Sequence, residues 1–131
     1  MMAELLEQLP AAVAYLTGPE HRFEFANDAY LRLVGRTDVV GKPVAEALPE
    51  VADQGYFEML NQVLATGRPA EGREAELWVR RDADELTQVY VDFLYEPVQD
   101  DDRVVGVLVH ADDVTGHVLD RRRAETRASE V

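Results

Sequence analysis

The sequence predicts an α+β domain: a five-stranded antiparallel sheet with short helices on one face, a short N-terminal helix and a C-terminal linker helix. Three observations lead to this prediction. Five short segments have the apolar or alternating pattern of β-strands. Helical segments separate the second of these strands from the third. A polar segment of helical character then closes the chain.

Composition and charge fit a single soluble domain. The chain has 131 residues, of which 47% are hydrophobic and 30% are charged, enough for one core. The net charge is −13, and the arginine-rich tail after residue 115 carries about +1, so the negative charge lies on the preceding residues. Such an acidic body would repel phosphate backbones, so no nucleic-acid partner is expected. There is no apolar run of membrane-spanning length and no secretory signal, which predicts a cytoplasmic protein without a membrane partner.

The first ten residues predict a short amphipathic helix, residues 1–10. Leu5, Leu6 and Leu9 fall on one stripe of it, and Pro10 ends it. So short a helix is unstable alone, and its apolar stripe must therefore pack on its own domain or on a partner chain.

A strand pair and a capped helix follow. Residues Ala11–Leu16 are apolar and His21–Ala26 alternate, and the short turn between them predicts an antiparallel hairpin. Asn27 then stands at a natural N-cap position, which predicts a helix over Asp28–Val34. Gly35 ends that helix at a position where a left-handed residue is common.

Two further helical regions precede the remaining strands. Glycine and proline divide residues 41–51 into single turns, which predicts a compact, partly 3₁₀ segment. In Val51–Thr66 the apolar residues, Phe57 and Leu60 among them, fall on one face. This pattern predicts a longer helix, which Gly67 ends.

Three strands separated by polar turns predict an antiparallel meander. They are expected at Glu71–Arg80, Leu86–Pro97 and Arg103–His110. The domain organisation predicted is therefore an amphipathic helix in residues 1–10, a folded domain in residues 11–115 and an outgoing helix in residues 116–131.

Six pieces of the sequence match, in order and spacing, the PAS family of sensor domains. They are the strand pair AVAYL…RFEFAN, the helix NDAYLRLVG, the segment GKPVAEALPE, the helix end LATGRP, the strand segment YEPV and the closing DVTGH. None of these pieces is specific alone, whereas their order over residues 5–120 is specific. The chain therefore resembles a PAS domain of the type found N-terminal to bacterial histidine kinases, phosphatases or cyclic-dinucleotide enzymes.

The resemblance implies a sensory and dimerising module whose sheet and helices enclose a pocket. It also implies that an Asp-x-Thr motif at the end of the last strand anchors the outgoing helix, and here that motif falls on Asp113 and Thr115. The expected partners are a second copy of the chain, a C-terminal effector domain such as a kinase or phosphatase, and a small-molecule ligand where the pocket holds one.

The cofactor is unknown from the sequence, but the chain lacks the cysteine and the helix histidine by which some PAS relatives hold a flavin, a chromophore or haem. It has no cysteine, which excludes a flavin photoadduct and a thioester-linked chromophore. Haem-binding relatives place an axial histidine on the longer helix, and Val51–Thr66 contains none, so haem is not expected. The three histidines, His21, His110 and His117, lack metal-ligand spacing, and no metal site is predicted.

A non-covalent ligand is left open. The inward-facing apolar and aromatic residues fit two interpretations: a filled core, which such spacing usually means, or the lining of a ligand pocket. The candidate lining residues are Phe25, Asn27, Tyr30, Leu33, Phe57, Leu60, Leu77 or Trp78, Val91, Phe93, Tyr95 and Val107. Asn27, Tyr30 and Tyr95 have a polar end that needs a partner when buried, and they would mark a binding site.

The opposite face of the sheet is also expected to carry apolar side chains, a patch that water disfavours. The N-terminal helix or a partner subunit would cover it, and a symmetric dimer that buries both is predicted. The predicted dimer interface consists of Leu5, Leu6, Leu9, Tyr90, Leu94 and Leu108.

Together these features predict a non-catalytic sensory and dimerisation module of a bacterial signal-transduction protein, which relays changes in the pocket or dimer interface to the C-terminal helix. One alternative is a dimerisation spacer without ligand. Another is a small cup-shaped α+β enzyme of the isomerase or dehydratase type, using a Tyr–Asp pair such as Tyr90 and Asp92 or Tyr95 and Asp113. Such enzymes open with long helices, whereas this chain is expected to place its strands first and a polar helix last.

Overall fold

The computed structural model describes residues 11–81 and 85–129, and it has the predicted α+β fold. The strands are β1 (Ala12–Thr17), β2 (Arg22–Ala26), β3 (Ala70–Arg80), β4 (Leu86–Asp100) and β5 (Arg103–Asp113). The helices are α2 (Asp28–Val34), α3 (Val44–Ala47), α4 (Pro49–Val51), the π-helical turn η1 (Ala52–Tyr56), α5 (Phe57–Thr66) and α6 (Thr115–Ser129). The predicted helix in residues 1–10 lies outside the described residues.

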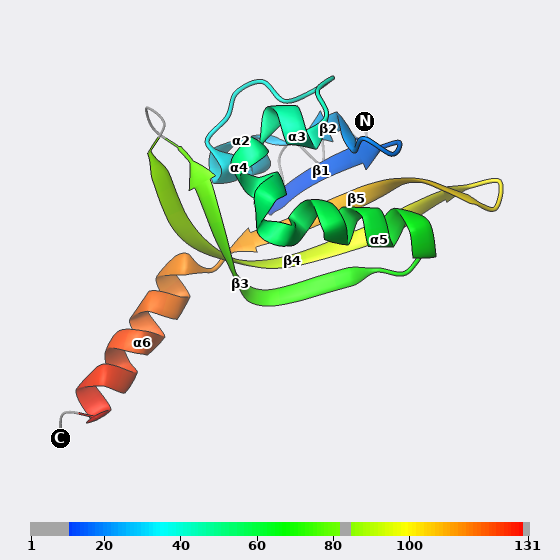
Figure 1. The fold of residues 1–131 in the computed structure, drawn as a ribbon. Coiled ribbons are helices and arrows are strands. Elements are labelled where there is room, and N and C mark those ends of the chain that lie inside the picture. Colours follow the sequence, from blue (N-terminus) through cyan, green and yellow to red (C-terminus); the bar gives the residue numbers. More distant parts are fainter. Residues whose placement is uncertain (1–10, 82–84, 130–131) are drawn as a thin grey trace.

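The five strands form one antiparallel sheet in the order β2-β1-β5-β4-β3. Helices α2 to α5 lie on one side of this sheet, and α6 leaves the end of β5 and projects away from the domain (Figure 1). The hydrophobic core lies between the helix layer and the inner face of the sheet. Among the helices in the described residues, none combines the length and the hydrophobicity of a membrane-spanning segment.

A β-bulge in the first hairpin decides which aromatic residue reaches the core. Tyr15 pairs with Phe25, but Leu16 pairs with Phe23, so Glu24 has no partner opposite it. Paired residues place their side chains on the same face of a sheet. Phe23 therefore enters the core with Leu16 and is 1% exposed, whereas Phe25 lies half-buried on the other face with Tyr15.

Helix α2 begins and ends where the sequence predicts. The side chain of Asn27 accepts a hydrogen bond from the backbone N–H of Tyr30, as an N-cap does. Gly35 adopts the left-handed conformation with φ of 67°, and its N–H returns to carbonyls of the last turn. Both ends are therefore fixed by local capping chemistry.

The prediction of one continuous helix over Val51–Thr66 is wrong. Helix α4 ends at Val51, and α5 begins only at Phe57. Between them Gln54 and Gly55 leave helical geometry, with φ of 92° at Gly55. Glycine adopts this φ without the steric cost that a Cβ atom imposes, so a single residue interrupts the helix although the apolar periodicity continues through it.

Side chains of the helical segment cover part of the outer edge of β3. Gln54 forms hydrogen bonds with both the N–H (2.8 Å) and the carbonyl (2.7 Å) of Trp78. Glu50 accepts from the N–H of Arg80 (2.9 Å), while Arg36 donates to the Arg80 carbonyl and pairs with both carboxylate oxygens of Glu50 (2.7 and 2.8 Å). These contacts occur at alternate residues, as a neighbouring strand would make them, and they hold the segment against the sheet.

The last three strands form the predicted meander and extend beyond the predicted spans. At the β4–β5 turn, Asp101 and Asp102 both have positive φ, a conformation that aspartate tolerates better than most residues. Strand β3 contains a bulge between Gly72 and Ala75, and within it Glu74 has φ of 51°. This bulge breaks the regular alternation of β3.

Candidate functional site

A small cavity lies between the helices and the inner face of the sheet, with a volume of about 40 Å³. Helix α2, the α4–η1 segment and strands β3, β4 and β5 all contribute to its wall. The lining residues are Tyr30, Leu33, Val34, Val51, Tyr56, Leu77, Val91, Phe93, Tyr95, Val109 and Ala111.

The structure brings half of the candidate pocket residues together at this cavity. They are Tyr30, Leu33, Val91, Phe93 and Tyr95, and Leu77 joins them. Trp78, the alternative to Leu77, points away from the core and is 42% exposed.

The other candidate residues lie elsewhere. Phe25 is displaced to the opposite face by the bulge, and Asn27 is used in a backbone network at the start of α2. Leu60 and Val107 are buried in the core without reaching the cavity, and Phe57 is half-buried beside the ring of His21. Side-chain alternation identifies the inner face of a strand but not which inner residues border a void.

Sequence reasoning missed several lining residues. Val109 and Ala111 share the inward phase of Val107 on β5, so the alternation could have indicated them. Val51 and Tyr56 reach the cavity only because the chain turns at Gly55, and no local pattern signals that geometry.

Three tyrosines give the apolar cavity its polar groups. Tyr56 donates its hydroxyl to the carbonyl of Glu76 (2.6 Å). The hydroxyls of Tyr30 and Tyr95 form no hydrogen bond with another described residue. Burial raises the pKa of Tyr30, and burial together with the neighbouring Tyr30 and Tyr56 raises the pKa of Tyr95 well above its ordinary value. All three phenols are therefore neutral at physiological pH. Because the one hydroxyl proton of Tyr56 goes to Glu76, Tyr30 and Tyr95 are the two that can donate to a ligand.

The size of the cavity limits what it holds in this conformation. One ordered water needs about 10–15 Å³ of such space, whereas drug-sized ligands occupy sites of about 300–1,000 Å³. At about 40 Å³ the cavity has room for water molecules but not for an organic ligand. Binding of an organic molecule would require the α4–η1 segment or α2 to move outward.

His21 is a buried polar residue that sequence reasoning placed only at a strand start. It is fully buried, and its ring Nε2 lies 2.7 Å from Oδ1 of Asn61 on α5. Its ring also meets Phe57 edge-on, with centroids 5.2 Å apart. Among the described residues its Nδ1 has no hydrogen-bond partner. The contact joins the β1–β2 turn to α5, forty positions away, which no local pattern indicates.

Asp113 and Thr115 form a hydrogen-bonded joint between β5 and α6, the strand–helix joint. Oδ1 of Asp113 accepts from the Thr115 N–H (3.0 Å) and from its hydroxyl (2.5 Å). Oγ1 of Thr115 accepts in turn from the N–H of Tyr90 (2.9 Å), and the Val114 N–H donates to the Tyr90 carbonyl (2.8 Å). The start of α6 is thus attached to β4, the strand that supplies three of the cavity residues.

Arg81 connects the same joint to α2. Its Nε and Nη2 donate to the carbonyl of Leu33 (3.1 and 2.9 Å), and Nη2 lies 3.5 Å from Oδ2 of Asp113. Leu33 lines the cavity. The guanidinium therefore stands between a cavity residue and the carboxylate that holds the first turn of α6.

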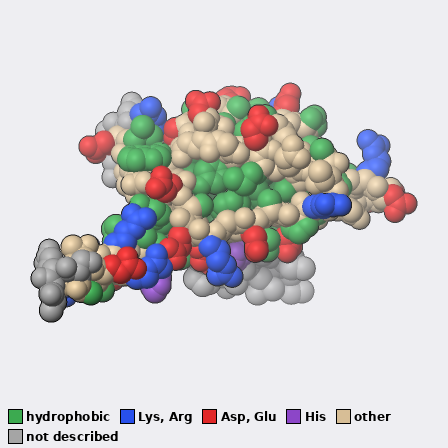
Figure 2. Space-filling model, turned by 60° about the horizontal axis from the view of Figure 1, so that its bottom comes forward, with side chains coloured by type: hydrophobic (Ala, Val, Ile, Leu, Met, Phe, Trp, Pro, Cys, Tyr) green, Lys and Arg blue, Asp and Glu red, His purple; other side chains and the backbone are tan. Residues whose placement is uncertain are grey.

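Two arginines of α6, the arginine clamp, fasten this helix to the outer face of the sheet. Arg121 donates to both carboxylate oxygens of Glu74, one of them at 2.7 Å, and these hydrogen bonds lower the pKa of Glu74. Arg122 donates to the hydroxyl of Tyr90 (2.9 Å), and its guanidinium carbon lies 4.9 Å from the centre of that ring. Figure 2 shows basic and acidic side chains side by side where the helix meets the body of the domain.

The bulge in β3 links the arginine clamp to the cavity. The N–H of Glu74 donates to Oδ1 of Asp92 (2.8 Å). Gly72 lies against Phe93 so closely that an added Cβ would stand 2.3 Å from the ring, and Phe93 lines the cavity. In such close packing, a shift of Phe93 displaces the strand segment that carries Glu74.

The residues expected at a dimer interface are only partly described. Leu5, Leu6 and Leu9 lie outside the described residues. Leu94 and Leu108 are half-buried. Tyr90 is 5% exposed and lies beneath Arg122, so α6 covers at least part of its ring.

No group of three or more histidine, aspartate or glutamate side chains in residues 11–81 and 85–129 has an arrangement that could hold a metal ion. His110 and His117 are exposed, and neither lines the cavity.

The fold and the cavity define an α+β domain in which a five-stranded sheet and short helices enclose a small internal space. A family model described as PAS fold matches residues 6–118, which is most of the chain. The chain belongs to the PAS fold family.

Solved structures share this fold at low sequence identity. An RNA-binding light-oxygen-voltage receptor is 20% identical with a TM-score of 0.71; the match covers 98% of this chain but only 36% of the receptor. A domain of a sensory box sensor histidine kinase/response regulator from Geobacter sulfurreducens is 17% identical with a TM-score of 0.62, covering 86% and 90%. VqmA bound to DPO is 20% identical with a TM-score of 0.65, covering 86% of this chain and 56% of VqmA.

Proposed function

We propose that this PAS domain is a non-catalytic sensory and dimerisation module of a bacterial signal-transduction protein. One observation carries the proposal: a continuous set of contacts runs from the cavity through β4 to the strand–helix joint. Val91, Phe93 and Tyr95 line the cavity, and Tyr90 of the same strand binds Thr115 through its backbone N–H. A structural change at the cavity is therefore transmitted to the start of α6.

The mechanism has three steps. A ligand that enters the cavity, or a change at a dimer interface, shifts β4 relative to β5. The hydrogen bonds of Asp113 and Thr115 then change length or break. Helix α6 finally changes its angle to the sheet, and an attached effector responds to that change.

The arginine clamp gives this mechanism a second contact point. If the joint alone held α6, the helix could pivot about residue 115. The pairs Arg121–Glu74 and Arg122–Tyr90 restrain the helix about two turns later. The Arg121–Glu74 ion pair is at the surface and weak, so a small shift of β3 suffices to release it.

The histidine-kinase context is the effector proposal that the comparisons support best. The Geobacter structure is described as a domain of a sensor histidine kinase/response regulator, and this chain covers nearly all of it. In this proposal α6 continues into a kinase or phosphatase, and a homodimer forms through the outer sheet face with Leu94 and Leu108. The N-terminal stripe of Leu5, Leu6 and Leu9 takes part in the same interface.

The contacts of one of the two candidate Tyr–Asp pairs, Tyr90 and Asp92, support a non-catalytic role. The Tyr90 hydroxyl accepts from Arg122, and the Asp92 Oδ1 accepts from the Glu74 backbone. A general acid–base pair needs its groups directed at a substrate site, and neither residue lines the internal cavity.

Replacing Asp113 with alanine is expected to release the first turn of α6 while the domain stays folded. The Thr115 N–H and hydroxyl lose their shared acceptor, so amide exchange in residues 115–118 should accelerate by about tenfold, as expected when a local constraint is lost. Hydrogen–deuterium exchange measures this effect. In the signalling protein that carries the domain, the same variant should lose coupling between stimulus and output.

Asp112→Ala is the matched control because Asp112 is the exposed neighbour on the same strand. It should leave exchange in α6 unchanged. Equal exchange and equal signalling in the wild-type protein and Asp113→Ala would contradict a relay through the joint.

A ligand-free dimerisation spacer is the second candidate function, and the small volume of the cavity favours it. The ligand-sensing form of the proposal draws on the Tyr30 and Tyr95 hydroxyls, which have no hydrogen-bond partner among the described residues, and on VqmA, whose structure contains DPO. The two candidates differ in whether the cavity opens to take up a molecule.

Native mass spectrometry of freshly purified protein separates the two candidates. For a sensor, the native mass should exceed the denatured mass by a small molecule, and Ala111→Leu, which fills the cavity, should remove the excess. Ala45→Leu adds the same atoms on the surface and should retain it. A native mass that equals an integral number of bare chains would favour the spacer, and that number reports whether the chain dimerises.

A further inference from the structure

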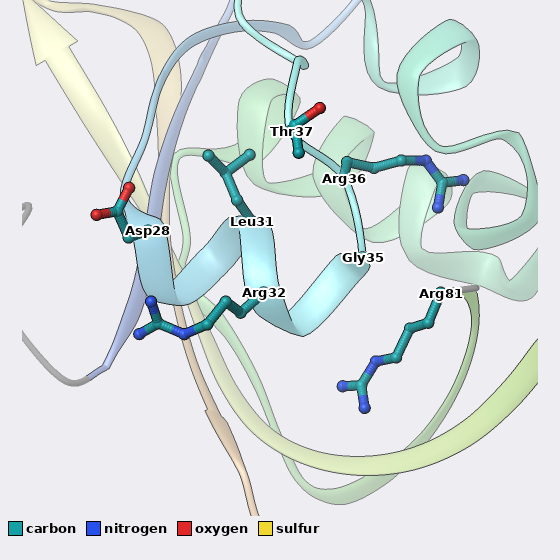
Figure 3. A pocket seen from close by; sticks show the side chains of 7 residues that line it. All are labelled: Asp28, Leu31, Arg32, Gly35, Arg36, Thr37 and Arg81. Atoms are coloured by element: carbon teal, nitrogen blue, oxygen red, sulfur yellow. The ribbon is translucent and has the colours of Figure 1, made fainter.

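Two surface clefts meet at a pair of arginines beside the strand–helix joint. The first, of about 530 Å³, runs along the exposed side of α2, and the second, of about 300 Å³, borders Asp113. Arg32 and Arg81 line both clefts. Figure 3 shows the Arg32 side chain extending toward the Asp28 end of α2 and the Arg81 side chain beside the Gly35 end, whereas the guanidinium of Arg36 is turned away from both.

Among the described residues, few carboxylates neutralise the positive charge of Arg32 and Arg81. Arg32 is exposed and forms no ion pair or hydrogen bond with any described residue, Asp28 of the preceding turn included. In residues 11–81 and 85–129, Asp113 is the one carboxylate paired with Arg81, at the long distance of 3.5 Å. Arg36 differs, because Glu50 neutralises it through two hydrogen bonds. Of the carboxylates in the described residues, Asp113 is therefore the one that pairs with either guanidinium, although Asp28 also lines the first cleft.

The position of Arg81 is fixed before any ligand arrives. The Leu33 carbonyl holds its Nε and Nη2, and Gly35 packs on its backbone so closely that an added Cβ would stand 2.6 Å from the Arg81 Cα. These contacts leave Nη1 without a hydrogen-bond partner among the described residues. A fixed guanidinium with unused donors loses little conformational entropy on binding an anion.

We propose that Arg32 and Arg81 bind the phosphate group of a small organic phosphate. Guanidinium groups match the geometry of phosphate with paired hydrogen bonds, and a dianion needs two cations to approach so acidic a protein. The first cleft is large enough for more than a phosphate, and its neutral residues Leu31, Gly35 and Thr37 would contact the uncharged part of the molecule.

The bound phosphate competes with Asp113 for Arg81. Asp113 has one oxygen on Thr115 and the other facing Arg81, so loss of the arginine changes the electrostatic environment of the strand–helix joint. An effect on α6 rests on the proposed relay function. The binding of phosphate and its competition with Asp113 do not rest on that function, and both can be measured in the isolated domain.

Calorimetric titration of the chain with pyrophosphate, at constant ionic strength, tests the proposal. Wild-type protein should bind one equivalent saturably, and Arg32→Gln should weaken the affinity by about tenfold, as loss of one cation from a two-cation site does. Asp113→Asn keeps the acceptor for Thr115 but removes the competing charge, so it should tighten binding by about threefold or more.

Arg103→Gln is the matched control because it removes the same charge from the exposed start of β5. It should change the affinity by less than about twofold, since screening limits the reach of a distant charge. An equal loss in Arg103→Gln and Arg32→Gln, or no saturable binding to wild-type protein, would overturn the site. Unchanged or weaker binding in Asp113→Asn would overturn the competition. If pyrophosphate binds as described and α6 exchange stays constant, the relay fails while the site stands.

Discussion

Replacing Asn27 with alanine should lower the free energy of unfolding by about 3–5 kcal/mol, because each buried backbone group left unpaired costs about 1–3 kcal/mol. Asn27 is fully buried, and its Oδ1 accepts from the N–H groups of Val13 and Tyr30, both at 2.9 Å. Its Nδ2 donates to the carbonyl of Ala11 at 2.9 Å. Alanine can replace none of these contacts, and chemical denaturation of the two proteins measures the loss.

Asp28→Ala is the matched control at the same helix end. Asp28 is exposed and contributes only its charge to the first turn of α2, so its loss should cost about 0.5 kcal/mol. A cost for Asn27→Ala that is no larger than this control would mean that water or a backbone shift satisfies the three groups. The predicted difference therefore tests whether Asn27 joins α2 to β1 or merely starts a helix.

The two ends of α2 illustrate what sequence can predict. An asparagine before a helical pattern and a glycine after it indicate where a helix starts and stops, because capping is a matter of adjacent backbone groups. The bounds Asp28–Val34 are confirmed. The contacts that make these ends important were not predictable in the same way, because β1 and Arg81 are distant in sequence and reach α2 only in the folded domain.

Bulges and glycine turns account for most of the differences between prediction and structure. Strand alternation assumes a period of two, so one extra residue at Glu24 moves Phe25 to the opposite face. Helical periodicity likewise continued through Gly55, where the chain in fact turns and brings Tyr56 to the cavity. A single residue decides each case, and neither apolar pattern contains that information.

The joint was easier to locate than the cavity. Asp113 and Thr115 are two residues apart, and their hydrogen bonds form within a single turn, so a short motif identifies them. The cavity needs residues from six elements to leave a space between them. The inner faces predicted for β4 and β5 therefore identified only part of the cavity wall. The small volume of the cavity depends on how closely the α4–η1 segment packs.

Replacing Gly35 with alanine should destabilise the domain by about 2–5 kcal/mol, from two separate causes. Alanine at a left-handed φ costs about 1–2 kcal/mol, and overpacking adds about 1–3 kcal/mol. Gly35 has φ of 67°, and an added Cβ would stand 2.6 Å from the Cα of Arg81, a backbone atom that cannot rotate away. Denaturant unfolding with unchanged slope measures the effect.

Gly18→Ala measures the first cause alone. Gly18 has nearly the same φ, 72°, but a Cβ there would meet no heavy atom within 4 Å. It should therefore cost only the conformational part, about 1–2 kcal/mol. Equal losses in the two variants would show that the end of α2 can move off Arg81 without penalty. A larger loss at Gly35 means that α2 and Arg81 form one rigid contact, so outward movement of α2 to open the cavity also displaces the arginine beside Asp113.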